Sequence, residues 1–184
     1  GNIKLAESIS KTAEDVGNQY IKTFSFSSHE IGLLFGNVQS GKTGQMFGIM
    51  CKAADLGFPV FVLLTTDNVV LQQQTLDRVK SDLSGFCICG ETDGGLFLEN
   101  SLIEPTIIVL KKNYRILKLW AGILNSTGFM KGNPLFIIDD EADAASLNTL
   151  INKGKKSSIN RYLDMIKNES SSSIYLQVTG TPQA

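Results

Sequence analysis

Short, continuous runs of apolar residues alternate along the chain with longer segments in which apolar residues recur every three or four positions. A short continuous apolar run is typical of a strand that is buried on both faces. Because these runs alternate with helical segments, the pattern predicts an α/β fold, in which helices cover both faces of a parallel sheet and the crossovers are right-handed. The predicted strands are Ile31–Phe35, Val60–Thr65, Thr106–Leu110, Leu135–Asp139 and Ile174–Thr179.

The segments between these runs predict helices, several of which begin at a residue that can cap a helix. Residues 1–28 are expected to form an N-terminal helical segment, and residues 29–184 a single domain. Residues 83–104 are rich in glycine and predict no definite element, whereas the polar, basic segment 148–158 predicts a loop. The predicted helices cover residues 43–56 and about 68–80, begin at Asn113 and at Ser158, and follow a looser helical period over residues 3–24.

Composition and charge limit the class of protein. The chain has 184 residues, of which 42% are apolar and 19% charged, as expected of one globular domain. Its formal charge of −1 excludes a generally basic surface, so any contact with nucleic acid must come from local basic loops. No apolar stretch approaches the roughly 20 residues of a membrane span, and the start is too polar for a secretion signal. We therefore expect a cytoplasmic protein that does not contact membranes.

The cysteines and the single histidine argue against several kinds of site. Three cysteines, Cys51, Cys87 and Cys89, are an odd number and include no second pair that could complete a zinc site. Ordinary buried or half-buried thiols are the better interpretation. Any nucleophilic triad that depends on histidine would have to use His29, and the sequence around it offers no support for one.

A glycine-rich turn joins the first predicted strand to the helix over residues 43–56. Residues 36–43 read Gly-Asn-Val-Gln-Ser-Gly-Lys-Thr and match the pattern G-x-x-x-x-G-K-[ST] without a mismatch. In this pattern backbone N–H groups and the helix N-terminus surround the phosphates, the lysine reaches the β and γ oxygens, and the hydroxyl binds Mg²⁺. The alternative is an incidental glycine turn. The predicted nucleotide-binding residues are Gly36, Val38, Gln39, Ser40, Gly41, Lys42 and Thr43.

Acidic residues follow the strand Leu135–Asp139, as nucleotide hydrolysis requires. One carboxylate must hold Mg²⁺ and a second must orient the attacking water. We predict Asp140 for the metal and Glu141 for the water, with Asp139 as a rival for the metal because it directly ends the apolar run. Adjacent residues of a strand face opposite ways, so Asp139 and Asp140 cannot both reach one metal without a bend. The alternative is a solvated acidic first turn of a helix.

The order of these motifs resembles that of superfamily 2 helicases. Residues 140–143 read Asp-Glu-Ala-Asp, which is similar to the box that gives the DEAD-type enzymes their name. Thr65 and Thr66 follow the second strand at the place of motif Ia, and Lys111 and Lys112 follow the third at the place of motif Ib. Residues 179–182, Thr-Gly-Thr-Pro, resemble motif III in the form seen in remodelling and restriction translocases.

Longer segments narrow the resemblance. The stretches "GNVQSGKTGQMFGIMCKAADLGFPVFVLLT", "VLKKNY" and "IIDDEADAASLNT" together are similar to the Z-one domain family, named for a proposed endonuclease. The similarity runs from about Gly32 to Pro182. Members of that family carry a superfamily 2 ATPase and occur in bacterial restriction and phage-defence systems. In addition, Gln19 lies 17 positions before Gly36, which is the spacing of the adenine-reading glutamine in DEAD-box proteins.

The resemblance implies a P-loop NTPase whose residues 29–184 form one RecA-like lobe, the first motor lobe of an ATP-hydrolysing DNA translocase or helicase-like enzyme. Lys42 and Glu141 would be its catalytic residues, with ATP and Mg²⁺ as ligands. The expected partners are nucleic acid, with DNA favoured, and restriction or defence subunits. A second RecA-like lobe is expected outside these residues, and without its arginine finger the fragment should hydrolyse ATP slowly.

The resemblance also assigns roles at the edge of the sheet. Thr179, Gly180 and Thr181 would couple the nucleotide state to the nucleic-acid side, while Thr65, Thr66, Lys111 and Lys112 would contact the nucleic-acid backbone. The two lysines could equally belong to the solvated face of a helix. Two other functions stay open: an ATP-dependent switch or assembly module without nucleic acid, and a metal nuclease built on residues 139–143. A small-molecule kinase would not explain the Asp-Glu-Ala-Asp and Thr-Gly-Thr-Pro motifs.

Overall fold

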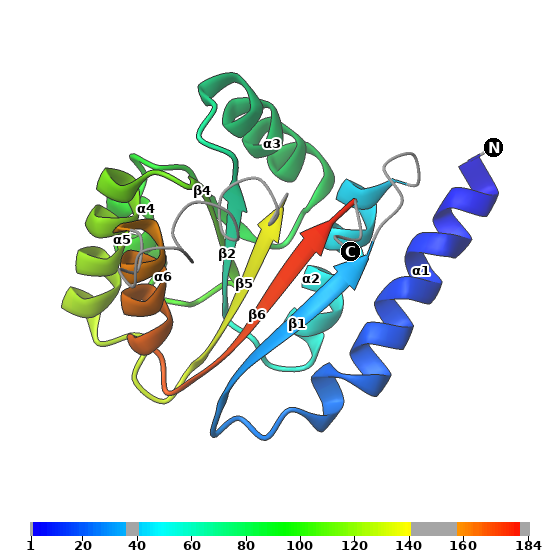
Figure 1. Ribbon diagram of the computed structural model, residues 1–184, viewed down its shortest axis with the longest axis horizontal. Helices are drawn as coiled ribbons and strands as arrows, with labels where there is room; N and C mark the ends of the chain where they lie inside the picture. The colour runs from blue at the N-terminus through cyan, green and yellow to red at the C-terminus, as the bar shows by residue number, and fades with distance from the viewer. Residues whose placement is uncertain (1, 36–40, 141–157, 181–184) are drawn as a thin grey trace, which may run out of the picture.

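The computed structural model describes residues 2–35, 41–140 and 158–180. These residues form one six-stranded sheet in which every neighbouring pair of strands is parallel, in the order β1-β6-β5-β2-β4-β3 (Figure 1). The α/β prediction is therefore confirmed. The strands are β1 His29–Phe35, β2 Val60–Thr65, β3 Cys87–Cys89, β4 Thr106–Lys111, β5 Pro134–Asp140 and β6 Ser172–Thr179.

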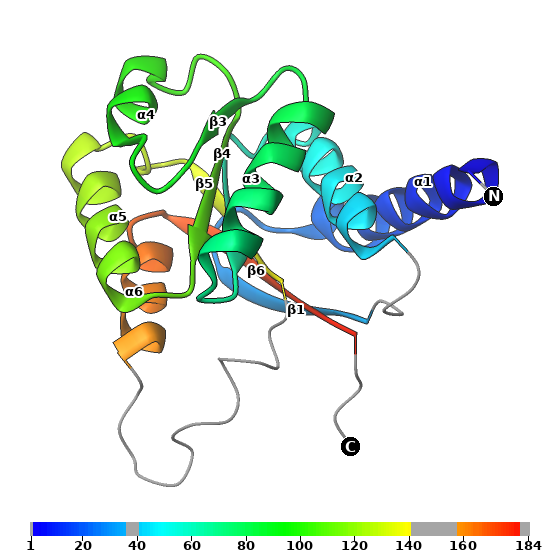
Figure 2. The same ribbon diagram turned by 90° about the horizontal axis from the view of Figure 1, so that it is seen from above.

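Helices cover both faces of this sheet (Figure 2). α2 (Lys42–Asp55) and α3 (Val69–Asp82) pack on one face. α4 (Gly94–Asn100), α5 (Tyr114–Thr127) and α6 (Ser158–Asn168) pack on the other. α1 (Asn2–Gln19) lies against α2, and a short 3₁₀ turn, η1 (Ile21–Thr23), leads from it towards β1. In the described part of the chain no helix combines the length and apolarity needed to cross a bilayer.

The central strands are buried on both faces, as their apolar runs predict. All six residues of β2 are buried. Phe61 and Leu63 enter the core cluster beneath α2 and α3, whereas Val60, Val62 and Leu64 enter the cluster beneath α5 and α6. Alternate residues of one strand thus supply two separate cores, which is why the run contains no polar position before its end.

The helix predictions agree with the structure at their starts. Asn68 caps α3, where its side chain accepts a hydrogen bond from the Leu71 N–H at 3.1 Å. Asn113 caps α5 in the same way, through the Arg115 N–H at 3.0 Å. The segment 83–104 contains β3 and α4, neither of which the sequence predicted, and most of the loop predicted over 148–158 lies outside the described residues.

The N-terminal segment is packed onto the sheet domain through glycines of α2. A Cβ atom at Gly44 would lie 2.6 Å from Ile9 Cδ1, and one at Gly48 would lie 3.2 Å from Ala13 Cβ. Because the two glycines are one helical turn apart, they form a smooth strip along which α1 approaches α2 closely. α1 therefore forms an outer layer on α2.

One face of β1 is exposed. β1 is an edge strand, and on it Ile31 and Leu33 are 66% and 53% exposed. Their neighbours Gly32 and Leu34 face α1 and are half-buried. An edge strand with an open face tolerates charge, and lysine is a residue that edge strands commonly carry.

Replacing Leu33 with lysine should therefore change the free energy of unfolding by less than about 0.5 kcal/mol. The matched core variant Leu63→Ala removes a fully buried side chain and should cost about 2–5 kcal/mol. Urea denaturation followed by circular dichroism measures both. A loss for Leu33→Lys as large as that for Leu63→Ala would contradict the exposed position of this face.

Candidate functional site

The ends of three neighbouring strands bring the predicted motifs to one edge of the sheet. β6 lies between β1 and β5, and its register pairs Thr179 with Phe35 on one side and Val178 with Asp140 on the other. The glycine-rich turn follows Phe35, so it leaves the sheet beside the end of β6, and Asp140 ends the next strand. The order and register of the strands thus place the two predicted halves of a nucleotide site one strand apart.

The glycine-rich turn enters the described chain at Gly41, which is left-handed with φ of 71° and precedes the first residue of α2, Lys42. A side chain is disfavoured here, because a Cβ would be strained at this φ and would lie 2.7 Å from Leu5 Cδ1, so that the Leu5 side chain would have to shift. Lys42 and Thr43 occupy the first turn of α2, where the helix carries partial positive charge. The other predicted turn residues, Gly36, Val38, Gln39 and Ser40, lie outside the described residues.

Lys42 and Asp140 meet across this edge. Lys42 Nζ lies 2.9 Å from Asp140 Oδ1, and their side chains are 18% and 24% exposed. Asp140 Oδ1 is nevertheless buried and receives no well-oriented hydrogen bond from any described residue. The contact is thus a close ion pair that leaves a carboxylate oxygen with unused capacity to bind a donor or a metal.

Asp139 points to the opposite face of the sheet. Its Oδ1 accepts from Lys112 Nζ at 2.6 Å, and its Oδ2 accepts from the Tyr175 hydroxyl at 2.5 Å. The side chains of Lys112 and Asp139 are 1% and 0% exposed. The two aspartates thus face opposite ways, as expected of adjacent strand residues, and the structure brings Asp140, not Asp139, to Lys42.

Burial is the largest influence on the pKa of the Asp139 carboxyl. It raises the pKa of the Asp139 carboxyl above the ordinary value, while the Lys112 ammonium and the Tyr175 hydroxyl favour the carboxylate and limit that rise. Burial, and next the charge of Asp139, raise the pKa of the Tyr175 phenol, so the phenol keeps its proton and its O–H donates a hydrogen bond to the carboxylate. The outcome is a satisfied buried network that joins the end of β5 to β6 and to the residue that follows β4.

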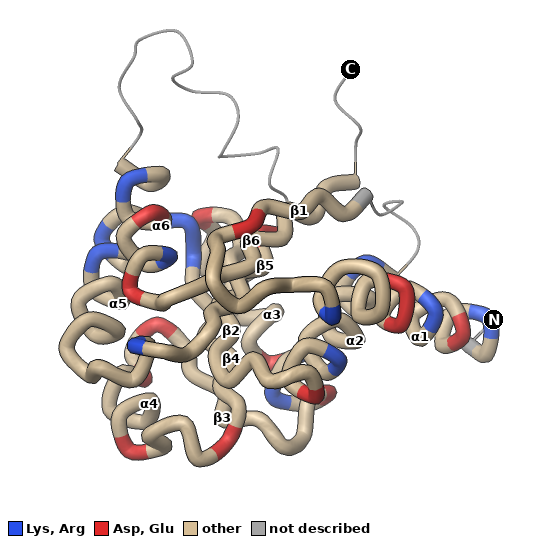
Figure 3. The backbone as a smooth tube through the Cα atoms, turned by 90° about the horizontal axis from the view of Figure 1, so that it is seen from below, with Lys and Arg blue, Asp and Glu red and all other residues tan. Residues whose placement is uncertain are grey.

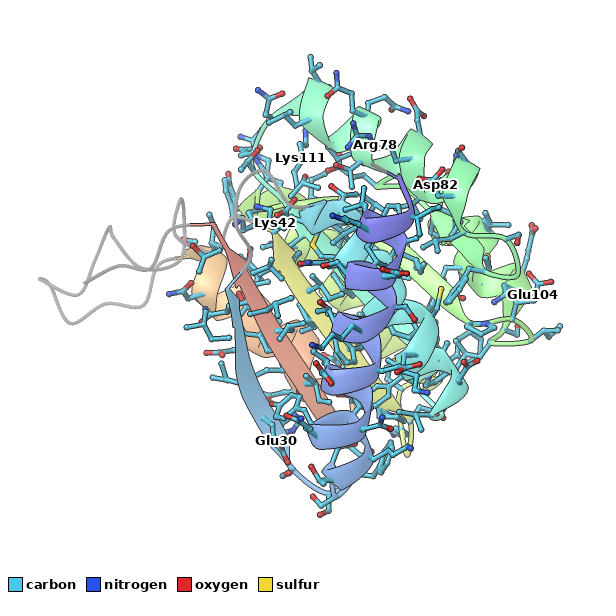
Figure 4. All side chains as sticks on the ribbon, turned by 90° about the vertical axis from the view of Figure 1, so that its right-hand side faces the viewer. Glu30, Lys42, Arg78, Asp82, Glu104 and Lys111 are labelled. Atoms are coloured by element: carbon cyan, nitrogen blue, oxygen red, sulfur yellow. The ribbon has the colours of Figure 1, made fainter. Side chains whose placement is uncertain are left out.

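A polar pocket of about 250 Å³ opens beside the ion pair. Its lining comes from three places: Lys42, Thr43 and Asp140; Thr65 and Thr66 at the end of β2; and residues of α3. The Thr66 hydroxyl oxygen is buried there without a partner among the described residues. Lys42, Arg78 and Lys111 lie towards this end of the molecule, and Glu30 lies towards the other (Figure 4). The α3 residues that line the pocket are Leu71, Gln74, Thr75 and Arg78.

The four predicted nucleic-acid contacts differ in their access to solvent. Lys112 is buried in its ion pair with Asp139, which corrects its assignment to the surface, since its ammonium is unavailable to an external phosphate. Thr65 is also buried, and its hydroxyl donates to the Thr66 carbonyl at 3.2 Å. Thr66 and Lys111 are half-buried, and Lys111 Nζ lies 3.7 Å from Glu91 Oε2. Only Thr66 and Lys111 therefore keep part of their side chains accessible.

Charge at this edge comes partly from residues that the motifs did not indicate. Arg78 on α3 and Arg115 on α5 are both exposed, and Arg115 lies over the Tyr114 ring at 5.6 Å. Over the described helices as a whole, basic and acidic positions are interspersed (Figure 3). This agrees with the expectation that any nucleic-acid contact depends on local groups. Side chains alternate between the two faces at the end of a strand. This alternation was the signal that one residue of the pair Thr65 and Thr66, and one of the pair Lys111 and Lys112, would point inward.

Gln19 lies far along α1 from Gly41, where the described part of the glycine-rich turn begins. Leu5 contacts Gly41, and Gln19 is fourteen residues further along the same helix, about 21 Å at the usual helical rise. Gln19 instead lines a pocket with Tyr20, Gly32 and Leu34, towards the middle of β1. A spacing of 17 positions in sequence therefore does not bring Gln19 close to Gly41, and its adenine-reading role stays a prediction.

The remaining predicted residues belong to the carboxyl ends of β6 and β5 in the sequence, and the structure describes only some of them. Thr179 ends β6 and is buried, and Gly180, which follows it, is half-buried. Thr179 thus ends the strand that lies between β1 and β5, whereas the coupling role stays a prediction. Glu141 and Thr181 lie outside the described residues, as does Asp143. The described part of the chain contains no cluster of three or more metal-ligating side chains.

The cysteines agree with the expectation of ordinary thiols. Cys51 is half-buried, Cys87 and Cys89 are buried, and none of them forms a disulfide. Burial raises the pKa of the Cys51 thiol and of the Cys89 thiol, which makes both poor nucleophiles at neutral pH. They are therefore packing residues and add nothing to the candidate site.

Comparison with known proteins gives no assignment. No protein-family model matches this chain, and no curated protein matches it. What the fold and the site establish on their own is a six-stranded, all-parallel α/β domain that places a lysine and an aspartate in contact at the carboxyl edge of its sheet.

Proposed function

We propose that this chain is the ATP-binding and ATP-hydrolysing lobe of a DNA translocase or helicase-like motor of a bacterial restriction or defence system. The observation that carries the proposal is the contact between Lys42 and Asp140, 2.9 Å apart, at the edge where the glycine-rich turn enters α2. A phosphate site needs a cation and a helix N-terminus, and a magnesium site needs a carboxylate beside them. Lys42, the start of α2 and Asp140 supply these three groups.

The residues present fit a Mg²⁺–triphosphate. Lys42 would bind phosphate oxygens, and Thr43 and Asp140 would hold Mg²⁺, which neutralises the charge of the phosphates when it is bound. Asp140 Oδ1 is suited to this role because it is buried but lacks a well-oriented donor. In the structure Lys42 and Asp140 form one ion pair, and binding would exchange it for two attractive contacts, Lys42 with phosphate and Asp140 with Mg²⁺.

Three further roles belong to the proposal. Glu141 would orient the attacking water, and Thr179, Gly180 and Thr181 would transmit the nucleotide state, because β6 ends between the two halves of the site. Nucleic acid would lie along the same edge, where the half-buried Lys111 and the exposed Arg78 are the accessible basic groups. Such contacts to the backbone are independent of base sequence and weaken with salt.

ATP binding tests the first half of this proposal. Wild-type protein should bind ATP, and Mg²⁺ should tighten that binding, whereas Asp140→Asn should reduce the effect of Mg²⁺ while leaving metal-free binding largely intact. Isothermal titration with and without Mg²⁺ measures both affinities. Absence of any ATP binding would contradict the proposal.

DNA stimulation tests the second half and separates the motor from an ATP-dependent switch or assembly module. A motor should hydrolyse ATP faster when single- or double-stranded DNA is added, and the stimulation should fall as salt is raised. A switch that does not bind nucleic acid should respond to neither. A coupled ATPase assay on the longest stable form of the protein, at two salt concentrations, distinguishes the two.

The position of Asp139 disfavours the metal-nuclease alternative. Such a centre would need several carboxylates of residues 139–143 at one metal, but Asp139 is held on the other face of the sheet by Lys112 and Tyr175. DNA cleavage that survives Lys42→Ala but is lost in Glu141→Ala would restore that alternative.

A further inference from the structure

The network of Lys112, Asp139 and Tyr175 beside Asp140 contains a buried ion pair, which is uncommon. Lys112, the residue that follows β4, reaches under the end of β5 and is 1% exposed. A buried ion pair seldom stabilises a fold more than apolar side chains of the same size would, because both charges lose their hydration. A buried lysine at the edge of a candidate site therefore calls for another explanation.

The contacts of Lys112 supply one. Besides its bond to Asp139, Lys112 Nζ donates to the main-chain carbonyl of Asp140 at 3.2 Å. Tyr175, on β6, holds the other oxygen of Asp139 at 2.5 Å. One ammonium group therefore binds both the side chain of residue 139 and the backbone of residue 140, at the point where β5 leaves the sheet.

We infer that Lys112, Asp139 and Tyr175 form a positioning network that fixes the backbone at the end of β5, so that the Asp140 carboxylate faces Lys42, where it would hold Mg²⁺. The inference rests on the proposed function, because it concerns the same site. The three residues are positioning residues and do not touch the ligand. Groups that orient a metal-binding carboxylate commonly affect metal affinity as strongly as a weak ligand does.

The side from which each aspartate is held explains how this works. Asp139 is anchored on the α5 and α6 face, and Asp140 projects from the α2 face towards Lys42. Because the two residues are adjacent, rotation of the backbone that turned Asp140 away would have to pull Asp139 out of its contacts with Lys112 and Tyr175. The buried network thus resists the one motion that would misdirect the metal-binding carboxylate.

The test separates positioning from stability by removing the whole network at once. The variant Lys112→Met/Asp139→Val/Tyr175→Phe replaces every polar group with an apolar one of comparable size, so it leaves no buried charge unpaired. It should fold and should bind ATP without Mg²⁺ as the wild type does. The additional affinity that Mg²⁺ confers should fall by about 10-fold, in the range seen when groups supporting a metal ligand are removed.

Isothermal titration of ATP with and without Mg²⁺ measures that effect, and Lys167→Met is the matched control. Lys167 forms a partly exposed pair with Asp164 at 3.3 Å, so its loss should leave the Mg²⁺ effect unchanged. If the network served only stability, the triple variant would keep the Mg²⁺ effect of the wild type, or lose ATP affinity equally with and without metal. Either result would overturn the inference.

Two further results complete the test. If the triple variant does not fold, Tyr175→Phe, which removes one hydroxyl, should lower the Mg²⁺ effect on the order of two- to tenfold, and an unchanged effect would overturn the inference. If wild-type protein binds ATP with a clear Mg²⁺ effect but the variants match it, only the positioning role fails. If the wild type shows no Mg²⁺ effect at all, the proposed function fails as well.

Discussion

Replacing Lys112 alone with methionine should lower the free energy of unfolding by about 3–5 kcal/mol, the cost of removing one partner from a buried ion pair. The cause is Asp139, whose carboxylate is fully buried and would lose the ammonium 2.6 Å away. Tyr175 could not compensate, because a neutral hydroxyl donates one hydrogen bond but supplies no charge. Urea denaturation at neutral pH, followed by circular dichroism, measures the loss.

A comparison of variants shows whether the loss arises from an unpaired charge. The Lys112→Met/Asp139→Val/Tyr175→Phe variant should recover most of the stability, because no buried charge is left without a partner. The control Lys167→Met breaks a partly exposed ion pair and should cost less than about 1 kcal/mol. Equal losses in the single and triple variants would mean that packing volume, and not charge, explains the effect.

Replacing Lys42 with alanine should weaken ATP binding by roughly 10- to 100-fold, since hydrogen bonds to charged groups contribute about 1.5–3 kcal/mol. The same change should hardly affect stability, because Lys42 and Asp140 are both partly exposed and their pair contributes little to folding. Binding of a fluorescent ATP analogue measures the affinity, and thermal unfolding without nucleotide measures the stability.

Lys131→Ala is the control for this experiment. Lys131 is exposed and precedes β5, so it lies at the amino edge of the sheet, away from the glycine-rich turn. The Lys131→Ala variant loses the same positive charge as Lys42→Ala and should bind ATP with unchanged affinity. A loss of affinity equal to that of Lys42→Ala would show that net charge, and not a specific phosphate contact, governs binding.

The sequence predicts the elements that are buried on both faces and misses the smallest ones. β2 is evident because all six of its residues are buried, which leaves a run without polar positions. β3 has three residues and lies at an edge of the sheet, so its pattern is too short to distinguish from a turn. α4 has seven residues and contains two glycines, which weakens any helical signal.

Lys112 and Gln19 show why parts of the site could not be predicted. A lysine after a strand usually indicates a solvated side chain, and only the positions of Asp139 and Tyr175 on other strands reveal that Lys112 is buried. Gln19 was selected by its distance in sequence, but the direction of α1 carries it away from Gly41. Local patterns identify Lys42 because it follows the glycine-rich turn, and Asp140 because it lies at the end of an apolar strand. They do not specify which elements pack together.

The placement of β6 has a mechanical consequence for the site. Its backbone is hydrogen-bonded to β1 along one side and to β5 along the other, so two parallel ladders fix the separation of the strand that precedes the glycine-rich turn and the strand that carries Asp140. Capture of a ligand would then need only side-chain rearrangement at the rim, with Lys42 and Asp140 parting while the scaffold beneath them stays still. A rigid base of this kind lowers the entropic cost of closing on a small, highly charged molecule.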